Sequence, residues 1–209
     1  QFSRDGSTLA VTGFNNVATV FMVETAEQIA QLQHPANTSD MAWSPDDKML
    51  AVACADKKVH LWEVATGKKI RELEHAQAPY AVSFAPDGTR LVTGCGGDAV
   101  GTVLNLSIKT IEDNPICVWE VATGKLLRQM KGNKHVVFGT AVSPNGKYIA
   151  SASWDGSLRL WDAEQGTELT RDEGEGWITG AIFYHDGSHV RETRGVIQAL
   201  NSTDDHEVA

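Results

Sequence analysis

The sequence predicts an all-β protein that is built from a repeated unit, and three observations support this prediction. A turn signature, an aromatic or apolar residue followed by a short polar run, starts at Phe2, Trp43, Phe84, Val142 and Phe183. A second signature, an aromatic residue followed by a polar turn, starts at Phe21, Trp62, Trp119 and Trp161. Successive starts of the first signature are 41, 41, 58 and 41 residues apart. A period of this length, filled with short apolar segments, indicates a repeat array rather than one irregular domain.

The first two units are a series of short expected strands. The first unit begins late and contains three of them, at 8–12, 18–21 and 28–32. The second unit is complete, with expected strands at 39–43, 49–54, 59–62 and 69–73. These segments are rich in Val, Ile, Leu and Ala, a composition that is typical of strands buried on both faces.

The third unit carries an insertion. Its strands are expected at 80–84, 90–93, 116–119 and 126–130. The two signature residues lie 19 positions apart in the first, second and fourth units, but 35 positions separate Phe84 from Trp119. Sixteen residues have therefore been added within 94–113. Leu104, Leu106 and Ile108 alternate there, which favours an extended hairpin.

The fourth unit is regular and the fifth is degenerate. Strands are expected in the fourth unit at 138–142, 148–153, 158–161 and, weakly, 167–169. In the fifth unit 177–183 is a good first strand, but Ser202 stands where the second aromatic residue is expected. We predict one repeat domain over 1–201, followed by a solvated acidic tail at 202–209. Unit boundaries are expected near 1–33, 34–74, 75–131, 132–170 and 171–201.

Composition and charge narrow the class of partner and the compartment. The net charge of −9 argues against nucleic acid and anionic membranes, which both need clustered Lys and Arg. No apolar run is long enough to cross a bilayer. The three cysteines, Cys54, Cys95 and Cys117, have no metal-binding spacing, so we interpret them as reduced core thiols of a cytoplasmic protein. The chain has no signal-peptide pattern and no initiator Met, and we expect it to belong to a longer protein.

Four-stranded units of about forty residues that end in Trp-Asp or Trp-Glu resemble the WD-repeat β-propeller family. The resemblance implies a propeller of four-stranded antiparallel blades. It also implies a structural set in each blade: a His before the first strand, an Asp in the turn between strands two and three, and the Trp of strand three. The matching positions are His34, Asp56 and Trp62 in the second unit and His75, Asp113 and Trp119 in the third.

The fourth and first units depart from this set. The fourth keeps Asp155 and Trp161, but its histidine position falls on Gly132 or Asn133. Seven blades are common in the family, whereas about five WD-type units are visible here. The array is thus a closed five-bladed ring, a ring completed by another chain, or part of a larger propeller, and these alternatives stay open at the level of sequence.

No catalytic constellation is visible, and we predict no catalytic residue, no metal site and no cofactor. The two histidines at 185 and 189 are four residues apart, but on a turn and without a third ligand. Ser151, Ser153 and Asp155 are expected to be structural, because the family pattern pairs a strand serine with the turn Asp. The chain is therefore not expected to be an enzyme.

The loops before strand one and between strands two and three form the face on which propellers tend to bind partners. Aromatic residues at these positions are candidate partner-binding anchors, because they bury a large area at little entropic cost: Phe14, Tyr80, Phe138, Trp154 and Trp177. The insertion within 94–113 is expected on the same face. We predict a non-catalytic scaffold that binds a protein or peptide. The alternative is a sensor or regulatory propeller within a larger enzyme or signalling protein.

Overall fold

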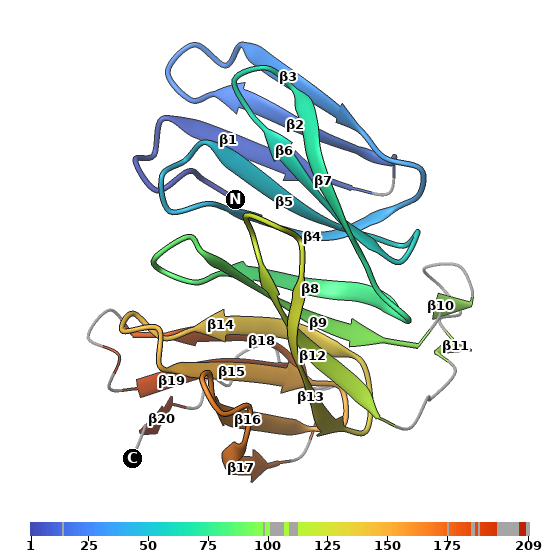
Figure 1. The fold of residues 1–209 in the computed structure, drawn as a ribbon, viewed down its shortest axis with the longest axis vertical. Coiled ribbons are helices and arrows are strands. Elements are labelled where there is room, and N and C mark those ends of the chain that lie inside the picture. The colour runs from blue at the N-terminus through green and yellow to red at the C-terminus, as the bar shows by residue number, and fades with distance from the viewer. Residues whose placement is uncertain are drawn as a thin grey trace.

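The structure of the chain, a computed structural model, describes residues 1–13, 15–97, 99–100, 107–108, 113–174, 176–184, 187, 189–195 and 205–207. The described residues form strands and connecting turns only, which confirms the all-β prediction. Five antiparallel sheets follow one another along the chain, from β1–β3 at the top of Figure 1 to β14–β17 and β18–β20 at the bottom. These sheets are the blades of a WD-type propeller.

The first two sheets have the strands that the sequence predicts. The first contains β1 (Thr8–Thr12), β2 (Val17–Met22) and β3 (Gln28–Gln33). An isolated bridge between Phe2 and Leu9 stands beside β1, where a first strand would lie. The second contains β4 (Thr38–Trp43), β5 (Met49–Cys54), β6 (Lys58–Glu63) and β7 (Lys68–Glu74). Five of the six residues of β5 are buried, because β5 lies in the middle of the sheet with another sheet on each face.

The third and fourth sheets are also four-stranded. The third contains β8 (Ala78–Phe84), β9 (Arg90–Gly96), β12 (Asn114–Glu120) and β13 (Leu126–Asn133). The insertion lies between β9 and β12 of this sheet. It contributes a separate two-stranded sheet of β10 (Ala99–Val100) and β11 (Ser107–Ile108). Leu104 and Leu106 lie outside the described residues. The fourth sheet contains β14 (Val137–Val142), β15 (Tyr148–Ser153), β16 (Ser157–Asp162) and β17 (Glu168–Glu173).

The fifth sheet corrects the prediction for the C-terminal residues. It contains β18 (Trp177–Phe183), β19 (His189–Gly195) and β20 (Asp205–Glu207). The sequence predicted a solvated tail over 202–209, but residues 205–207 pair with β19 in register His189 to Glu207. The open edge of β19 offers unpaired backbone groups, and a short acidic segment satisfies them as well as an apolar one does.

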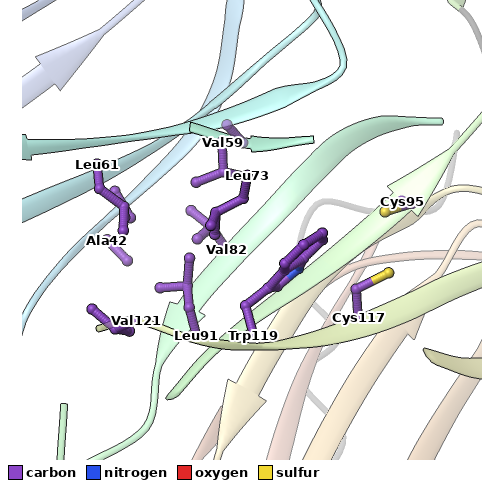
Figure 2. Packing of buried hydrophobic residues seen from close by; sticks show 12 residues of the cluster. Ala42, Val59, Leu61, Leu73, Val82, Leu91, Cys95, Cys117, Trp119 and Val121 are labelled. Atoms are coloured by element: carbon purple, nitrogen blue, oxygen red, sulfur yellow. The ribbon is translucent and has the colours of Figure 1, made fainter. Parts of the chain in front are cut away.

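A separate hydrophobic core lies between each pair of consecutive sheets. Trp62 packs toward the first sheet, Trp119 toward the second and Trp161 toward the third. Figure 2 shows the core between the second and third sheets, where Leu61 and Leu73 meet residues of the next blade such as Val82. Each blade is therefore held by its neighbours, as the repeat pattern predicts.

The same irregularity recurs in the first strand of four sheets. The register between the first and second strands shifts at one residue, which the pairing skips: Ser39, Tyr80, Phe138 and Thr179. A bulge of this kind bends the strand and re-aims the side chain that it carries. We call these four positions the bulge residues.

The first strands of consecutive sheets also line an open pocket. A volume of about 750 Å³ is lined by residues of β4, β8, β14 and β18 and by the N-terminal residues, among them Asp40, Phe138 and Thr179. Burial raises the pKa of the Asp40 carboxyl to about 6, although that carboxylate accepts a hydrogen bond from the backbone N–H of Val82 at 2.9 Å. This bond ties the second blade to the third.

All three cysteines carry free, buried thiols, as predicted. In the part of the chain that the structure describes, no helix has the length and apolar character needed to cross a membrane.

Candidate partner-binding surface

Four of the five predicted anchor residues form one continuous row. The ring centroids of Tyr80 and Phe138 are 5.3 Å apart, those of Phe138 and Trp154 are 5.2 Å apart, and those of Trp154 and Trp177 are 4.8 Å apart. We call these four residues the aromatic row. Separations of this size are within the favourable range for aromatic pairs, so the rings support one another. The fifth predicted anchor, Phe14, lies outside the described residues.

The row crosses three blades, and each blade supplies its members from a corresponding place. Tyr80 and Phe138 are bulge residues of β8 and β14. Trp154 follows β15 in the turn to β16, and Trp177 begins β18. The turn after the second strand lies at the same end of a blade as the start of the first strand. This is why Tyr80 and Phe138, which are 58 positions apart in sequence, can approach one another.

Close backbone approaches between blades bring the rings together. A Cβ atom at Gly94 of β9 would lie 2.5 Å from Val137, and one at Gly139 would lie 2.7 Å from the Cα of Gly180. Any side chain at these glycines would push β14 away from its neighbours on both sides. The two glycines thus set the separation of the strands that carry Tyr80, Phe138 and Trp177.

Exposure differs along the row. Trp177 is 42% exposed, whereas Tyr80, Phe138 and Trp154 are partly buried. The hydroxyl of Tyr80 donates to the carbonyl oxygen of Gly97 at 3.3 Å, so the first residues of the insertion lie at this end of the row. His135 packs its ring 5.3 Å from that of Trp154. His135 was not among the predicted residues, because the repeat position before the first strand falls on Val136, one residue later.

The structural set of the third blade contains a threonine that the sequence analysis omitted. Trp119 donates from Nε1 to Oγ1 of Thr93 at 3.1 Å, and Thr93 Oγ1 lies 2.9 Å from Nε2 of His75. Nδ1 of His75 donates to the carbonyl oxygen of Leu73 at 2.8 Å, so Nε2 accepts from the threonine. Burial lowers the pKa of His75 to about 4 and keeps the ring neutral. Asp113 is not part of this chain of bonds; its carboxylate lies 2.9 Å from Nζ of Lys131.

The second blade connects the same residues differently. Val52 replaces the threonine, and Trp62 donates directly to Nε2 of His34 at 3.1 Å. Burial is the main reason that the pKa of His34 is lowered to about 4, and the neighbouring His60 contributes. Asp56 lies 3.0 Å from Nε2 of His60 rather than beside His34. The family pattern predicted a hydrogen bond between Asp56 and His34. In the structure Asp56 instead bonds to His60, an additional histidine on β6.

The fourth blade has an asparagine at the histidine position. Trp161 donates to Oγ of Ser151 at 2.9 Å, and Ser151 lies 3.4 Å from Oδ1 of Asn133. Of the two positions that the sequence left open, Asn133 is therefore the one that enters the set. Asp155 accepts from the backbone N–H groups of Ser157 and Lys134 at 2.9 and 2.7 Å, so it organises the turn. These contacts keep buried polar groups paired and stabilise the blades.

Two parts of the chain match family models. Residues 33–87 match the anaphase-promoting complex subunit 4 WD40 domain, and residues 124–162 match the WD domain, G-beta repeat. The first match covers the second blade, and the second covers most of the fourth.

Curated proteins match over shorter stretches. MST50-interacting protein 11 of Pyricularia oryzae is 35% identical over 72 residues, which are 32% of this chain and 23% of that protein. Small ribosomal subunit protein RACK1 of Dictyostelium discoideum is 35% identical over 65 residues, 28% of this chain and 20% of that protein. Human striatin is 42% identical over 64 residues, 31% of this chain and 8% of that protein. The matched segments thus span less than a quarter of these relatives. The matched segments, the blades and their tryptophan-centred bonds all make the chain similar to WD-repeat proteins.

Proposed function

We propose that the chain is a non-catalytic interaction module and that the aromatic row binds a protein or peptide partner. The observation that carries this proposal is the continuity of the row over three blades, with Trp177 exposed at its end. An exposed indole beside a supported aromatic surface offers a large contact area that loses little side-chain freedom on binding. The name of one relative, MST50-interacting protein 11, says that this relative interacts with another protein, which supports such a role for the present chain.

Charge narrows the partner further. The chain has a net charge of −9, which favours a neutral or basic partner and disfavours nucleic acid and anionic lipid. Aromatic faces attract guanidinium groups as well as apolar side chains. We therefore infer an extended segment with bulky apolar or arginine side chains. Three buried free thiols favour a reducing compartment such as the cytoplasm.

The insertion supports the placement of the site. Because Tyr80 bonds to Gly97, the chain that leaves β9 starts at the Tyr80 end of the row. We infer that the residues at the end of β9 and just after it, Gly97 among them, border the bound partner at this end, while Trp177 marks the other.

A peptide selection tests the proposal directly. Peptides from a random phage-displayed library are selected on the immobilised protein, and their affinities are measured by fluorescence anisotropy. Trp177→Ala should weaken selected peptides at least about tenfold, which corresponds to about 1.4 kcal/mol of binding free energy. The matched control is Tyr184→Ala. Tyr184 follows the other end of the same strand, and its exposed fraction of 39% is similar to that of Trp177.

The outcomes distinguish the aromatic row from other surfaces. Equal affinity for the wild type and the Tyr184→Ala variant, with loss for Trp177→Ala, supports the row. Peptides that bind all three proteins equally would place the interaction elsewhere, and failure to select any peptide would contradict the proposal. Circular dichroism of each variant verifies that the blades remain folded.

A further inference from the structure

Three potential metal ligands meet at one end of the second blade. Cys54 ends β5, Asp56 lies in the turn and His60 lies on β6. One potential ligand atom from each side chain can be chosen such that all three lie within 4.8 Å of one another. Cys54 pairs with Lys58 across the two strands and Val52 pairs with His60, so the side chains of Cys54 and His60 leave the same face of the sheet. The hairpin itself therefore brings the thiol and the imidazole together.

The imidazole of His60 lies between two carboxylates. Its Nε2 is 3.0 Å from Oδ2 of Asp56, and its Nδ1 is 3.5 Å from Oε1 of Glu72 on the neighbouring strand β7. Metal-binding histidines commonly have a carboxylate at the ring nitrogen that faces away from the ion, because it fixes the ring and raises its basicity. Glu72 is itself held by Lys58 and Lys69. The arrangement thus has an inner set of donors and a carboxylate that faces the other ring nitrogen, although Nδ1 of His60 makes no hydrogen bond to it in this structure.

The fourth blade shows what these positions hold when a fixed cation is present. Ser153, Asp155 and Arg159 occupy the places of Cys54, Asp56 and His60. The guanidinium of Arg159 is almost fully buried and lies 3.9 Å from Asp155 and 2.6 Å from Glu168. The second blade keeps the turn aspartate but has an imidazole in place of the guanidinium and a thiol in place of the serine. On the neighbouring strand, Lys69 and Glu72 stand where the fourth blade has Glu168 and Arg171. A bound divalent ion would supply the positive charge that Arg159 supplies in the fourth blade.

We propose that Cys54, Asp56 and His60 form a binding site for a divalent transition-metal ion, with Zn²⁺ as the preferred ion. Sulfur and imidazole donors select zinc over calcium and magnesium, which prefer oxygen ligands only. On binding, the Cys54 thiol releases its proton to solvent and its sulfur bonds to the ion. The proton that His60 Nε2 donates to Asp56 leaves Nε2, and the ring takes up a proton at Nδ1, which faces Glu72. Nε2 of His60 and the carboxylate of Asp56 then each bond to the ion. The thiolate and the carboxylate then balance the charge of the ion. Three protein ligands leave a fourth tetrahedral position for water.

Cobalt is a spectroscopic substitute for zinc that reports on the cysteine. The purified protein is stripped with a chelator and titrated with Co²⁺ without oxygen. We expect one equivalent of Co²⁺ to produce a thiolate-to-cobalt charge-transfer band, and Zn²⁺ to abolish it. Cys54→Ser should abolish the band, and Glu72→Gln should weaken metal affinity by about tenfold or more. The control Cys95→Ser changes the corresponding thiol of the third blade and should leave the band intact.

Thermal unfolding gives a second readout that needs no chromophore. Zn²⁺ should raise the melting temperature of the wild type and of Cys95→Ser, since a ligand that binds the folded state stabilises it. It should have no effect on Cys54→Ser or on Asp56→Asn, which serves if Cys54→Ser does not fold. Absence of the band in the wild type, or a band and a Zn²⁺-dependent shift that persist in both variants, would overturn the proposal.

Discussion

The second and fourth blades share one backbone arrangement but pair the buried polar groups of that arrangement with different residues. Each has four strands, a register shift in its first strand, and a tryptophan that faces the preceding blade. In the second blade the indole donates directly to a histidine, and in the fourth it donates to a serine that contacts an asparagine. The comparison teaches that the repeat fixes where polar groups must be paired, while several combinations of residues can pair them.

The largest difference between the two blades is the buried charge of the fourth. Arg159→Ala should reduce the free energy of unfolding by about 3–5 kcal/mol, because Asp155 and Glu168 lose a buried partner. The matched control is Arg171→Ala, since the Arg171 side chain is 48% exposed and its guanidinium also faces Glu168. Its effect should be within about 1 kcal/mol. Urea unfolding followed by circular dichroism measures both, and similar losses for the two variants would show that burial is not what distinguishes them.

An intermediate effect on stability is expected from substitutions on the second strand, at the position that lies between the tryptophan and the histidine or asparagine of the set. Ser151→Ala leaves the indole N–H of Trp161 without its acceptor and should cost about 1–3 kcal/mol of stability. Val52→Thr introduces a hydroxyl where Trp62 can donate to it and His34 can accept from it, as in the third blade. It should change the stability by less than about 1 kcal/mol. If Val52→Thr costs as much as Ser151→Ala, the blades are not interchangeable at this position.

The last predicted difference appears only on acidification. The pKa of His34 is lowered to about 4 in the folded state, against 6.5 in the unfolded chain. The unfolded state therefore binds more protons between these values, so the stabilising contribution is complete above pH 6.5 and is lost as the pH falls towards 4. One proton changes the unfolding free energy by at most about 1.4 kcal/mol per pH unit.

Amide hydrogen exchange resolves this effect by blade. Protection in β4–β7 should fall more between pH 7 and pH 5 than protection in β14–β17, after correction for intrinsic exchange rates, because Asn133 does not titrate. His34→Asn should remove most of the difference. An equal fall in both blades of the variant and of the wild type would assign the acid sensitivity to another group, such as His75, whose pKa is also lowered to about 4.

The sequence was sufficient for the periodic features. Alternation and turn residues predicted β4 to β7 within a few residues, because each strand is short and bounded by polar turns. The pairing of residues 205–207 with β19 was missed, since an acidic tripeptide has no strand pattern and pairs only because an edge is available. Edge pairing is a property of the assembled sheet, not of the segment.

The site could be predicted only in part. Tyr80, Phe138, Trp154 and Trp177 were selected one by one from repeat positions, but their contact depends on close approaches such as Gly139 to Gly180. The partner of Asp56 was predicted incorrectly, because the family pattern has no histidine at position 60. Deviations from the repeat are thus where sequence reasoning fails, because local contacts replace the shared ones.

The bulge residues have a consequence for how such a surface can change. Equivalent places in four blades hold Ser39, Tyr80, Phe138 and Thr179, and the register between the first and second strands skips each of them. Because the pairing skips these positions, the register of the sheet does not depend on which side chain they carry, and side chains such as Tyr80 and Phe138 make their contacts with other blades instead. The scaffold can therefore keep its pairing while mutation tries new side chains at one blade after another. The paired residues of the strands thus maintain the fold, while the bulge residues can vary and change what the surface recognises.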